Sequence, residues 1–236
     1  MDNSSLDIIV PCFNPPFNWE KELCDNVAKL KGKLPDININ IILINDGSKT
    51  GINKDSISLI KKQVVNFKYI NYPVNRGKGF ALRKGVLESS STHLIFTDID
   101  FPYELDSILR VYSNLNNGID VVVGNRDLDY YKKTPFIRTL ISKTFRFILK
   151  TFLQLKVTDT QCGLKGFNKK GKAEFLKTTI DRFLFDLEFV KRCSQNNNIK
   201  IKAVAVTLKE GVIFSQMNFK ILAKEFLNFL VILVKK

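Results

Sequence analysis

Histidine and patterned cysteine are scarce in this sequence. It has a single histidine, His93, and its four cysteines form no C-x-x-C pair. Zinc centres that use several histidines or paired cysteines are therefore excluded, as is a small disulfide framework. We expect the cysteines to be reduced thiols of a cytoplasmic protein; they are Cys12, Cys24, Cys162 and Cys193.

Long apolar runs are also missing. The longest spans residues 229–234, far fewer than the roughly 18 residues that a transmembrane helix needs. No positively charged and then apolar leader precedes the first apolar segment. The expectation is a chain that does not cross a membrane by itself.

Acidic residues are outnumbered by basic ones, 23 to 37, which gives a formal charge of +14. An anionic partner is expected, such as nucleic acid, anionic lipid or a phosphorylated small molecule. The excess is local, because residues 131–172 contain eleven basic residues and one acid, Asp159. No nucleic-acid-binding module accompanies it, so nucleic acid is not the expected partner.

Short apolar runs alternate with amphipathic segments along the chain. Strands are expected over residues 7–12, 40–44, 68–72, 94–96, 120–124 and 199–206. Helices are expected over residues 19–31, 55–66, 103–117 and 134–155, from residue 182 onward, and over residues 219–233. This alternation predicts a mainly parallel α/β sheet covered on both faces. Ligands of such sheets bind beyond the carboxyl ends of the strands.

Two carboxylates, Asp98 and Asp100, follow the apolar run at residues 94–96. Residues i and i+2 of a strand share a face, so both side chains can converge on one cation at the strand end. Mg²⁺ prefers such oxygen ligands and often completes its shell with substrate phosphates. The alternative is that the two aspartates cap the helix expected over residues 103–117.

Asp46 follows another apolar run, so it is expected at the same edge of the sheet as Asp98. Between them in sequence lies a glycine-rich segment, residues 75–85, in which Arg76 and Lys78 add positive charge near a helix start. Backbone amides at such a start bind phosphate. The glycine spacing matches neither common nucleotide-binding signature, so a turn with solvated cations is the alternative.

Four of these segments, in this order, resemble the family 2 glycosyltransferases, and more narrowly the polyprenyl-phosphate (dolichol-phosphate) glucosyl- and mannosyltransferases. The matching segments are VPCFN at residues 10–14, NDGS at 45–48, NRGKG at 75–79 and DID at 98–100. DTQCGLK at residues 159–165 and FDLE at 185–188 look most like the dolichol-phosphate glucosyl branch. The resemblance covers roughly residues 7–206.

The resemblance implies a glycosyltransferase A-type fold, a Rossmann-like α/β/α sandwich over residues 1–210, with an amphipathic helix within residues 211–236. It places a donor nucleotide against Pro11, Phe13, Asn14, Asp46, Lys78 and Asp98. It places Mg²⁺ or Mn²⁺ on Asp98 and Asp100, and the acceptor phosphate on Arg126, Arg138 and Ser142. The residues expected to take part in catalysis are Asp98, Asp100, Arg126, Asp186 and Glu188. For the last two, the competing role is to stabilise a helix N-terminus.

Two departures from the family pattern concern the sugar and the membrane. Mannosyl members often have a metal-contacting glutamine four residues after the first aspartate of the D-x-D, where this chain has Pro102. The C-terminal transmembrane helices of many bacterial members are not expected here, because no apolar run of sufficient length is found. Membrane contact is then expected through amphipathic helices or a membrane-protein partner.

We therefore expect an inverting, metal-dependent hexosyltransferase, peripheral at the cytosolic face of a membrane. The expected donor is UDP-glucose first and GDP-mannose second, and the acceptor is polyprenyl phosphate. A phosphate oxygen is already anionic and needs no strong base, so His93 is expected to be structural. The alternative is a family 2 enzyme that acts on a glycan hydroxyl, with Asp186 or Glu188 as the base.

Overall fold

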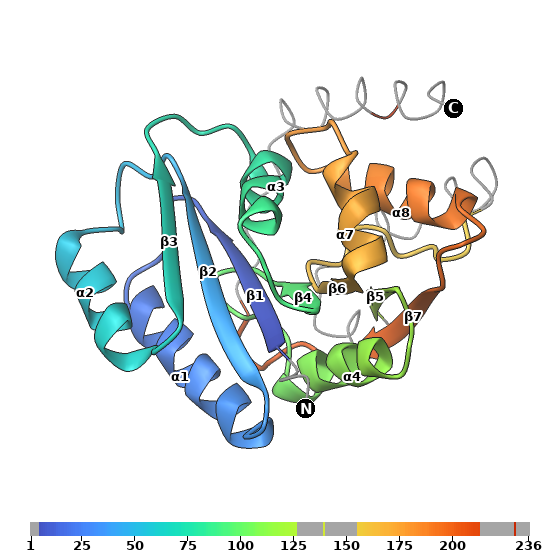
Figure 1. The fold of residues 1–236 in the computed structure, drawn as a ribbon. Coiled ribbons are helices and arrows are strands. Elements are labelled where there is room, and N and C mark those ends of the chain that lie inside the picture. The colour runs from blue at the N-terminus through green and yellow to red at the C-terminus, as the bar shows by residue number, and fades with distance from the viewer. Residues whose placement is uncertain (1–4, 127–138, 140–154, 213–228, 230–236) are drawn as a thin grey trace.

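Seven strands form one sheet in the computed structural model, which describes residues 5–126, 139, 155–212 and 229 (Figure 1). The strands are ordered β3-β2-β1-β4-β6-β5-β7 across the sheet. Neighbouring strands are parallel, except that β6 is antiparallel to both β4 and β5. The strands are β1 (Ser5–Cys12), β2 (Asn38–Asp46), β3 (Phe67–Tyr72), β4 (His93–Phe96), β5 (Val121–Arg126), β6 (Lys165–Asn168) and β7 (Ile201–Val206).

Helices cover both faces of the sheet (Figure 1), and an apolar cluster packs between the helices and the sheet on each side. On one face lie α1 (Trp19–Lys33), α2 (Lys54–Gln63) and α4 (Leu105–Asn116). On the other lie α3 (Lys78–Leu87), α7 (Lys169–Leu176) and α8 (Phe185–Gln195). The predicted α/β/α sandwich with a mainly parallel sheet is confirmed.

Strand β1 lies in the interior of the sheet, between β2 and β4, and both of its faces are apolar. Leu6, Ile8 and Val10 belong to the cluster under α1 and α4, whereas Ile9 belongs to the cluster under α3. All four side chains are fully buried. A strand covered on both faces has a continuous apolar run, which is why this strand could be recognised in the sequence.

The carboxyl ends of β1, β2 and β4 meet at one edge of the sheet because these strands are parallel. Strand β6 runs the other way and pairs its first residue, Lys165, with Phe96 at the end of β4. The segment that precedes β6 therefore reaches the same edge. We call this the carboxyl edge of the sheet.

The sequence did not predict β6 and α7. Residues 159–166 were interpreted as a polar segment, whereas β6 begins at Lys165 and is only four residues long. The helix expected over residues 134–155 and most of the helix expected over residues 219–233 lie outside the described residues. Phe229 is described, and it packs against the cluster on the α3 face. Within the described part of the chain, no helix is both long and apolar enough to cross a membrane.

Gly85 lets α3 lie directly on the sheet. A Cβ atom at this position would stand 2.6 Å from Ile9 Cγ2 and 2.7 Å from Ile44 Cδ1. Gly85→Ala is expected to lower the free energy of unfolding by about 1–3 kcal/mol through overpacking, as measured by urea denaturation. In Gly32→Ala, the control on α1, the added Cβ meets nothing within 4 Å. Gly32→Ala should raise the free energy of unfolding by about 0.5–1 kcal/mol. A Gly85→Ala variant that is more stable than the parent would contradict the packing described here.

Candidate functional site

A cavity of about 280 Å³ opens at the carboxyl edge of the sheet. Its walls come from the end of β1 and the turn after it, the end of β2, the loop that leads into α3, the turn after β4 and the loop before α8. The lining residues are Pro11, Cys12, Phe13, Asp46, Asn75, Gly77, Lys78, Asp98, Arg182 and Phe183. Every residue predicted to bind nucleotide lines this cavity except Asn14.

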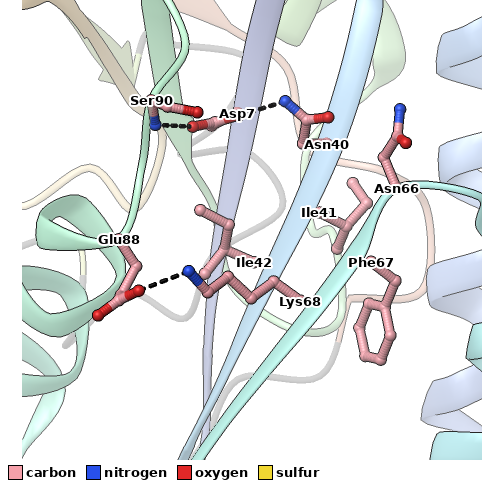
Figure 2. A pocket seen from close by; sticks show the side chains of 9 residues that line it. All are labelled: Asp7, Asn40, Ile41, Ile42, Asn66, Phe67, Lys68, Glu88 and Ser90. Carbon is pink, nitrogen blue, oxygen red and sulfur yellow. Dashed lines mark hydrogen bonds and ion pairs between the residues drawn. The ribbon is translucent and has the colours of Figure 1, made fainter.

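A second hollow, of about 300 Å³, lies at the amino ends of β1, β2 and β3, and Figure 2 shows the side chains that line it. Several of its polar groups are bound to one another, and Asn66 donates to Asn38 Oδ1 outside the hollow at 2.6 Å. The carboxylate of Asp7 accepts hydrogen bonds from Asn40 Nδ2 at 2.7 Å and from the Ser90 amide at 3.1 Å, and Lys68 pairs with Glu88 at 2.5 Å. These contacts occupy polar groups of this hollow, and none of the four matched segments lines it. We therefore place the functional site at the carboxyl edge, where those segments meet.

The buried carboxylate of Asp46 organises the loop between β3 and α3. Its Oδ1 accepts a hydrogen bond from the Arg76 amide at 2.7 Å, and its Oδ2 accepts bonds from the Gly77 amide at 2.8 Å and from Asn75 Nδ2 at 2.9 Å. Only 3% of Asp46 is exposed. The NDGS and NRGKG segments are therefore fastened to each other, and Lys78 follows directly at the start of α3.

Asn14 joins the turn after β1 to the turn after β2. Its amide donates to Ser48 Oγ at 2.8 Å, and its side-chain oxygen accepts a bond from the Lys49 amide at 2.8 Å. Its φ of +46° lies in the left-handed region that asparagine tolerates. Asn14 holds the backbone next to Phe13, whose ring stands at the cavity with 49% of its surface exposed.

The D-x-D turn is held in an unusual backbone conformation. Phe101 is bulky and buried yet has a φ of +42°, and its amide donates to the Asp98 carbonyl oxygen at 3.0 Å. Such strain is concentrated at functional sites. Helix α4 begins at Leu105 with Glu104 at its N-cap, so the alternative in which the two aspartates cap this helix is wrong. Partial desolvation and the nearby Asp98 raise the pKa of Asp100.

Two lysine–aspartate pairs lie near each other, one at the wall of the cavity and one buried. Lys78 Nζ stands 2.5 Å from Asp98 Oδ1, and Lys165 Nζ stands 2.5 Å from Asp186 Oδ1. Lys165 is fully buried and also donates to the Cys162 carbonyl oxygen at 2.5 Å. Burial raises the pKa of Asp186, and the charges of Lys165 and Lys78 oppose that shift. Asp186 therefore lies within electrostatic reach of Lys78 as well as Lys165.

Arg126 is held by a fork to Asp159. Its Nη2 lies 2.6 Å from Asp159 Oδ1, its Nε lies 2.9 Å from Oδ2, and its own amide donates to Oδ2 at 2.7 Å. Asp159 is fully buried. The end of β5 is thereby tied to the DTQCGLK segment. The predicted acceptor-phosphate residues Arg138 and Ser142 lie outside the described residues.

Glu188 fixes the loop that precedes α8. Its carboxylate accepts hydrogen bonds from the amides of Thr179 at 2.8 Å and Ile180 at 2.9 Å. The same loop carries Arg182 and Phe183 to the cavity. Glu188 itself is buried and is not among the residues that line the cavity.

The sequence did not identify five of the lining residues. They are Cys12, Asn75, Gly77, Arg182 and Phe183. The first three belong to matched segments, and the last two lie just before the FDLE segment, separated from it by Leu184. Burial raises the pKa of the Cys12 thiol to about 12, so this cysteine is not a thiolate nucleophile at neutral pH.

Asp98 and Asp100 offer oxygen ligands suited to Mg²⁺ or Mn²⁺. Within the described residues, no group of three or more histidine, cysteine, aspartate or glutamate side chains could hold a metal ion. Asp98 lines the cavity, whereas Asp100, in the same turn, is not among the lining residues. Two carboxylates leave further coordination positions for water and phosphate, which is the usual arrangement for Mg²⁺. The residues present therefore fit a cation that is shared with a phosphorylated ligand.

Comparisons with known sequences agree with the resemblance found in the sequence. The model of the family described as "Glycosyl transferase family 2" matches residues 7–174. The chain is 31% identical to a dolichyl-phosphate beta-glucosyltransferase of Dictyostelium discoideum, over 89% of this chain and 68% of that protein. Proteins with the same name from Drosophila melanogaster and Homo sapiens are 27% and 25% identical, over 87% of this chain and 67% of each. The chain spans about two thirds of the length of these relatives.

Solved structures agree with the fold. Glucosyl-3-phosphoglycerate synthase from Mycobacterium tuberculosis, in complex with UDP, has a TM-score of 0.58 at 15% identity, over 98% of this chain and 79% of that chain. A mannosyltransferase from Pyrobaculum calidifontis, in complex with GDP-Man and Mn²⁺, has a TM-score of 0.51 at 13% identity, over 87% and 58%. At such identities the likeness concerns the fold alone.

Gly163 touches the predicted cation ligand, because a Cβ atom there would lie 2.5 Å from Asp98 Oδ2. That oxygen ends a flexible side chain, so Gly163→Ala is expected to shift the carboxylate and to leave the melting temperature close to that of the parent. Mn²⁺ affinity, measured by calorimetric titration with UDP present, should fall about tenfold or more. Gly32→Ala should bind Mn²⁺ as the parent does. Unchanged affinity in Gly163→Ala would contradict the assignment of Asp98.

Proposed function

Because the chain belongs to glycosyl transferase family 2, we propose that it moves glucose from UDP-glucose to a polyprenyl phosphate such as dolichyl phosphate, with inversion at the anomeric carbon. The observation that carries the proposal is the meeting of the separate family segments around one cavity. The names of the three relatives favour glucose and a lipid phosphate. GDP-mannose is the second donor to be tested.

On the donor side, the nucleotide base lies against Pro11 and Phe13. Phe183, with 47% of its surface exposed, offers a second aromatic surface in the same cavity. Lys78 and Arg182 supply positive charge for the diphosphate, and a guanidinium suits phosphate because it donates paired hydrogen bonds.

Asp98 and Asp100 hold Mg²⁺ or Mn²⁺ in this proposal. Such a cation neutralises the negative charge that develops on the leaving diphosphate. Asp46 contributes indirectly, since it fixes the loop from which Lys78 emerges.

On the acceptor side, the phosphate is held by Arg126, together with Arg138 and Ser142. The fork with Asp159 fixes the orientation of the Arg126 guanidinium before any ligand arrives. Preorganised donors of this kind stabilise developing charge without a cost of reorganisation. The acceptor oxygen is already anionic, and the protein has only to align it with the sugar.

A glycan hydroxyl acceptor has less support, because it needs a general base. Asp186 is bound to Lys165, and Glu188 accepts hydrogen bonds from backbone amides. Both carboxylates thus have structural partners that compete with proton abstraction. We assign Asp186 the role of a counter-ion at the donor site and Glu188 the role of positioning the loop that carries Arg182.

We further propose that residues 1–210 form the catalytic domain; the amphipathic helix expected within residues 211–236 lies largely outside the described residues. The protein acts at the cytosolic face of a membrane, where its lipid acceptor lies. The basic stretch at residues 131–172 favours contact with an anionic lipid surface, directly or beside a membrane-protein partner.

The reaction can be tested with purified protein, Mg²⁺ or Mn²⁺, a panel of labelled nucleotide sugars and a short polyprenyl phosphate. Label from UDP-glucose is expected in the organic phase after extraction. Asp100→Ala should reduce this transfer at least about a hundredfold, because it removes a cation ligand. Asp36→Ala, which removes an exposed carboxylate from a turn, is the matched control and should transfer as the parent does.

Two outcomes would contradict the proposal. Label in the lipid phase from another donor and none from UDP-glucose would contradict the sugar assignment. Metal-dependent binding of UDP without any lipid product would contradict the acceptor assignment, and it would direct attention to glycan acceptors and to Asp186.

The role of Arg126 can be separated from that of the donor site. Arg126→Lys keeps the charge but loses the planar fork to Asp159, so the KM for polyprenyl phosphate should rise about tenfold while the Kd for UDP stays unchanged. Steady-state kinetics and UDP titration measure the two effects. Arg110→Lys on α4, whose side chain is exposed, is the control. A loss of UDP affinity in Arg126→Lys would contradict an acceptor role.

A further inference from the structure

Lys78 occupies the position where a divalent cation is expected. Its ammonium group stands 2.5 Å from Asp98 Oδ1, and the two side chains are 19% and 37% exposed. The pair therefore lies at the wall of the cavity, where solvent and ligands can reach it. Asp98 is at the same time one of the two proposed cation ligands.

An ammonium group and a divalent cation cannot share one carboxylate oxygen at contact distance. Both are positive, and in the partly desolvated wall of a cavity their repulsion at about 4 Å amounts to several kcal/mol per unit charge. A cation that binds Asp98 Oδ1 must therefore displace Lys78, and a cation on Oδ2 is still repelled by the ammonium group. The lysine side chain is long and flexible enough to move away from Asp98 while α3 stays in place.

Two anionic positions can receive the displaced ammonium group. One is Asp186, whose charge acts on Lys78 together with that of Asp98. Asp186 already has a partner in the buried Lys165, so it is partly neutralised. The other is the diphosphate of a donor bound in the cavity, which brings more negative charge than one carboxylate.

We propose that Lys78 is a resident counter-ion of Asp98 that is exchanged for the divalent cation and then binds the donor diphosphate. This inference rests on the proposed function. It adds that binding of the divalent cation and binding of the donor nucleotide are coupled through Lys78. Without nucleotide the cation competes with Lys78 for Asp98. With nucleotide the lysine has a new anion to bind, so cation and nucleotide strengthen the binding of each other by the same factor.

Lys165 does not share this role. It is fully buried and its ammonium is fixed by Asp186 and by the Cys162 carbonyl oxygen. Of the two lysines, only Lys78 lines the cavity. The exchange is therefore assigned to Lys78, and Lys165 keeps the charge of Asp186 compensated throughout.

The test is a Mn²⁺ titration of the parent protein, Lys78→Met and Lys84→Met, with and without UDP, using the electron paramagnetic resonance signal of free Mn²⁺. Lys78→Met should bind Mn²⁺ alone at least about tenfold more tightly than the parent, because the competing charge is gone. Its affinity for UDP at saturating Mn²⁺ should fall about tenfold, because the diphosphate loses a cation. Lys84→Met, which removes an exposed lysine from the same helix, should match the parent in both titrations.

A second pair of variants separates the effect of the charge of residue 78 from misfolding and from a purely structural role of the side chain. Lys78→Gln should repeat the gain in Mn²⁺ affinity, and Lys78→Arg, which keeps the charge, should not show it. Equal Mn²⁺ affinity in the parent, Lys78→Met and Lys78→Gln would overturn the exchange. If the parent nevertheless binds UDP and transfers glucose, only this inference fails. A parent that binds neither Mn²⁺ nor UDP and transfers no sugar would overturn the proposed function as well.

Discussion

The site depends first on the hydrogen bonds that Asp46 accepts from the amides of Arg76 and Gly77. They join the end of β2 to the start of α3, and they are strong because the acceptor is charged and buried. This connection sets where Lys78 leaves the backbone, and Lys78 in turn meets Asp98 after β4. Three segments that are far apart in the sequence thus share one wall of a cavity. A neutral residue at position 46 would leave two amides without that partner, and the loop and its lysine would lose their fixed place.

The part of the site that the DTQCGLK segment forms depends on buried charged side chains. Lys165 begins a strand in the interior of the sheet, where a lysine is tolerated only because Asp186 and the Cys162 carbonyl oxygen accept hydrogen bonds from its ammonium group. The same strand runs antiparallel to its neighbours, which turns the DTQCGLK segment toward the carboxyl edge. Gly163 then contacts Asp98, and Asp159 holds Arg126. The donor and acceptor halves of the proposed reaction are therefore linked through one short segment.

The sequence predicted the features that depend on local pattern. Apolar runs marked the ends of β2 and β4, and parallel order then placed Asp46 and Asp98 at one edge. It could not predict β6, because four residues that start with a lysine carry no apolar signature and because their pairing is nonlocal. Nor could it show that Glu188 binds the amides of the loop before α8, or that Phe183 from this loop lines the cavity. Such contacts depend on the packing of α8, which no short motif encodes.

In the proposed reaction, a lipid phosphate attacks the donor sugar directly. This attack has a stereochemical consequence. It is tested most directly by the anomeric configuration of the lipid-linked glucose formed from UDP-glucose, read from the proton coupling constant of the anomeric centre in a nuclear magnetic resonance spectrum. The donor is α-linked, and a single displacement aligned by the two phosphate sites predicts a β-linked glucosyl phosphate. An α-linked product would contradict the account, because it requires either a two-step path or a front-side reaction for which this arrangement of residues offers no explanation.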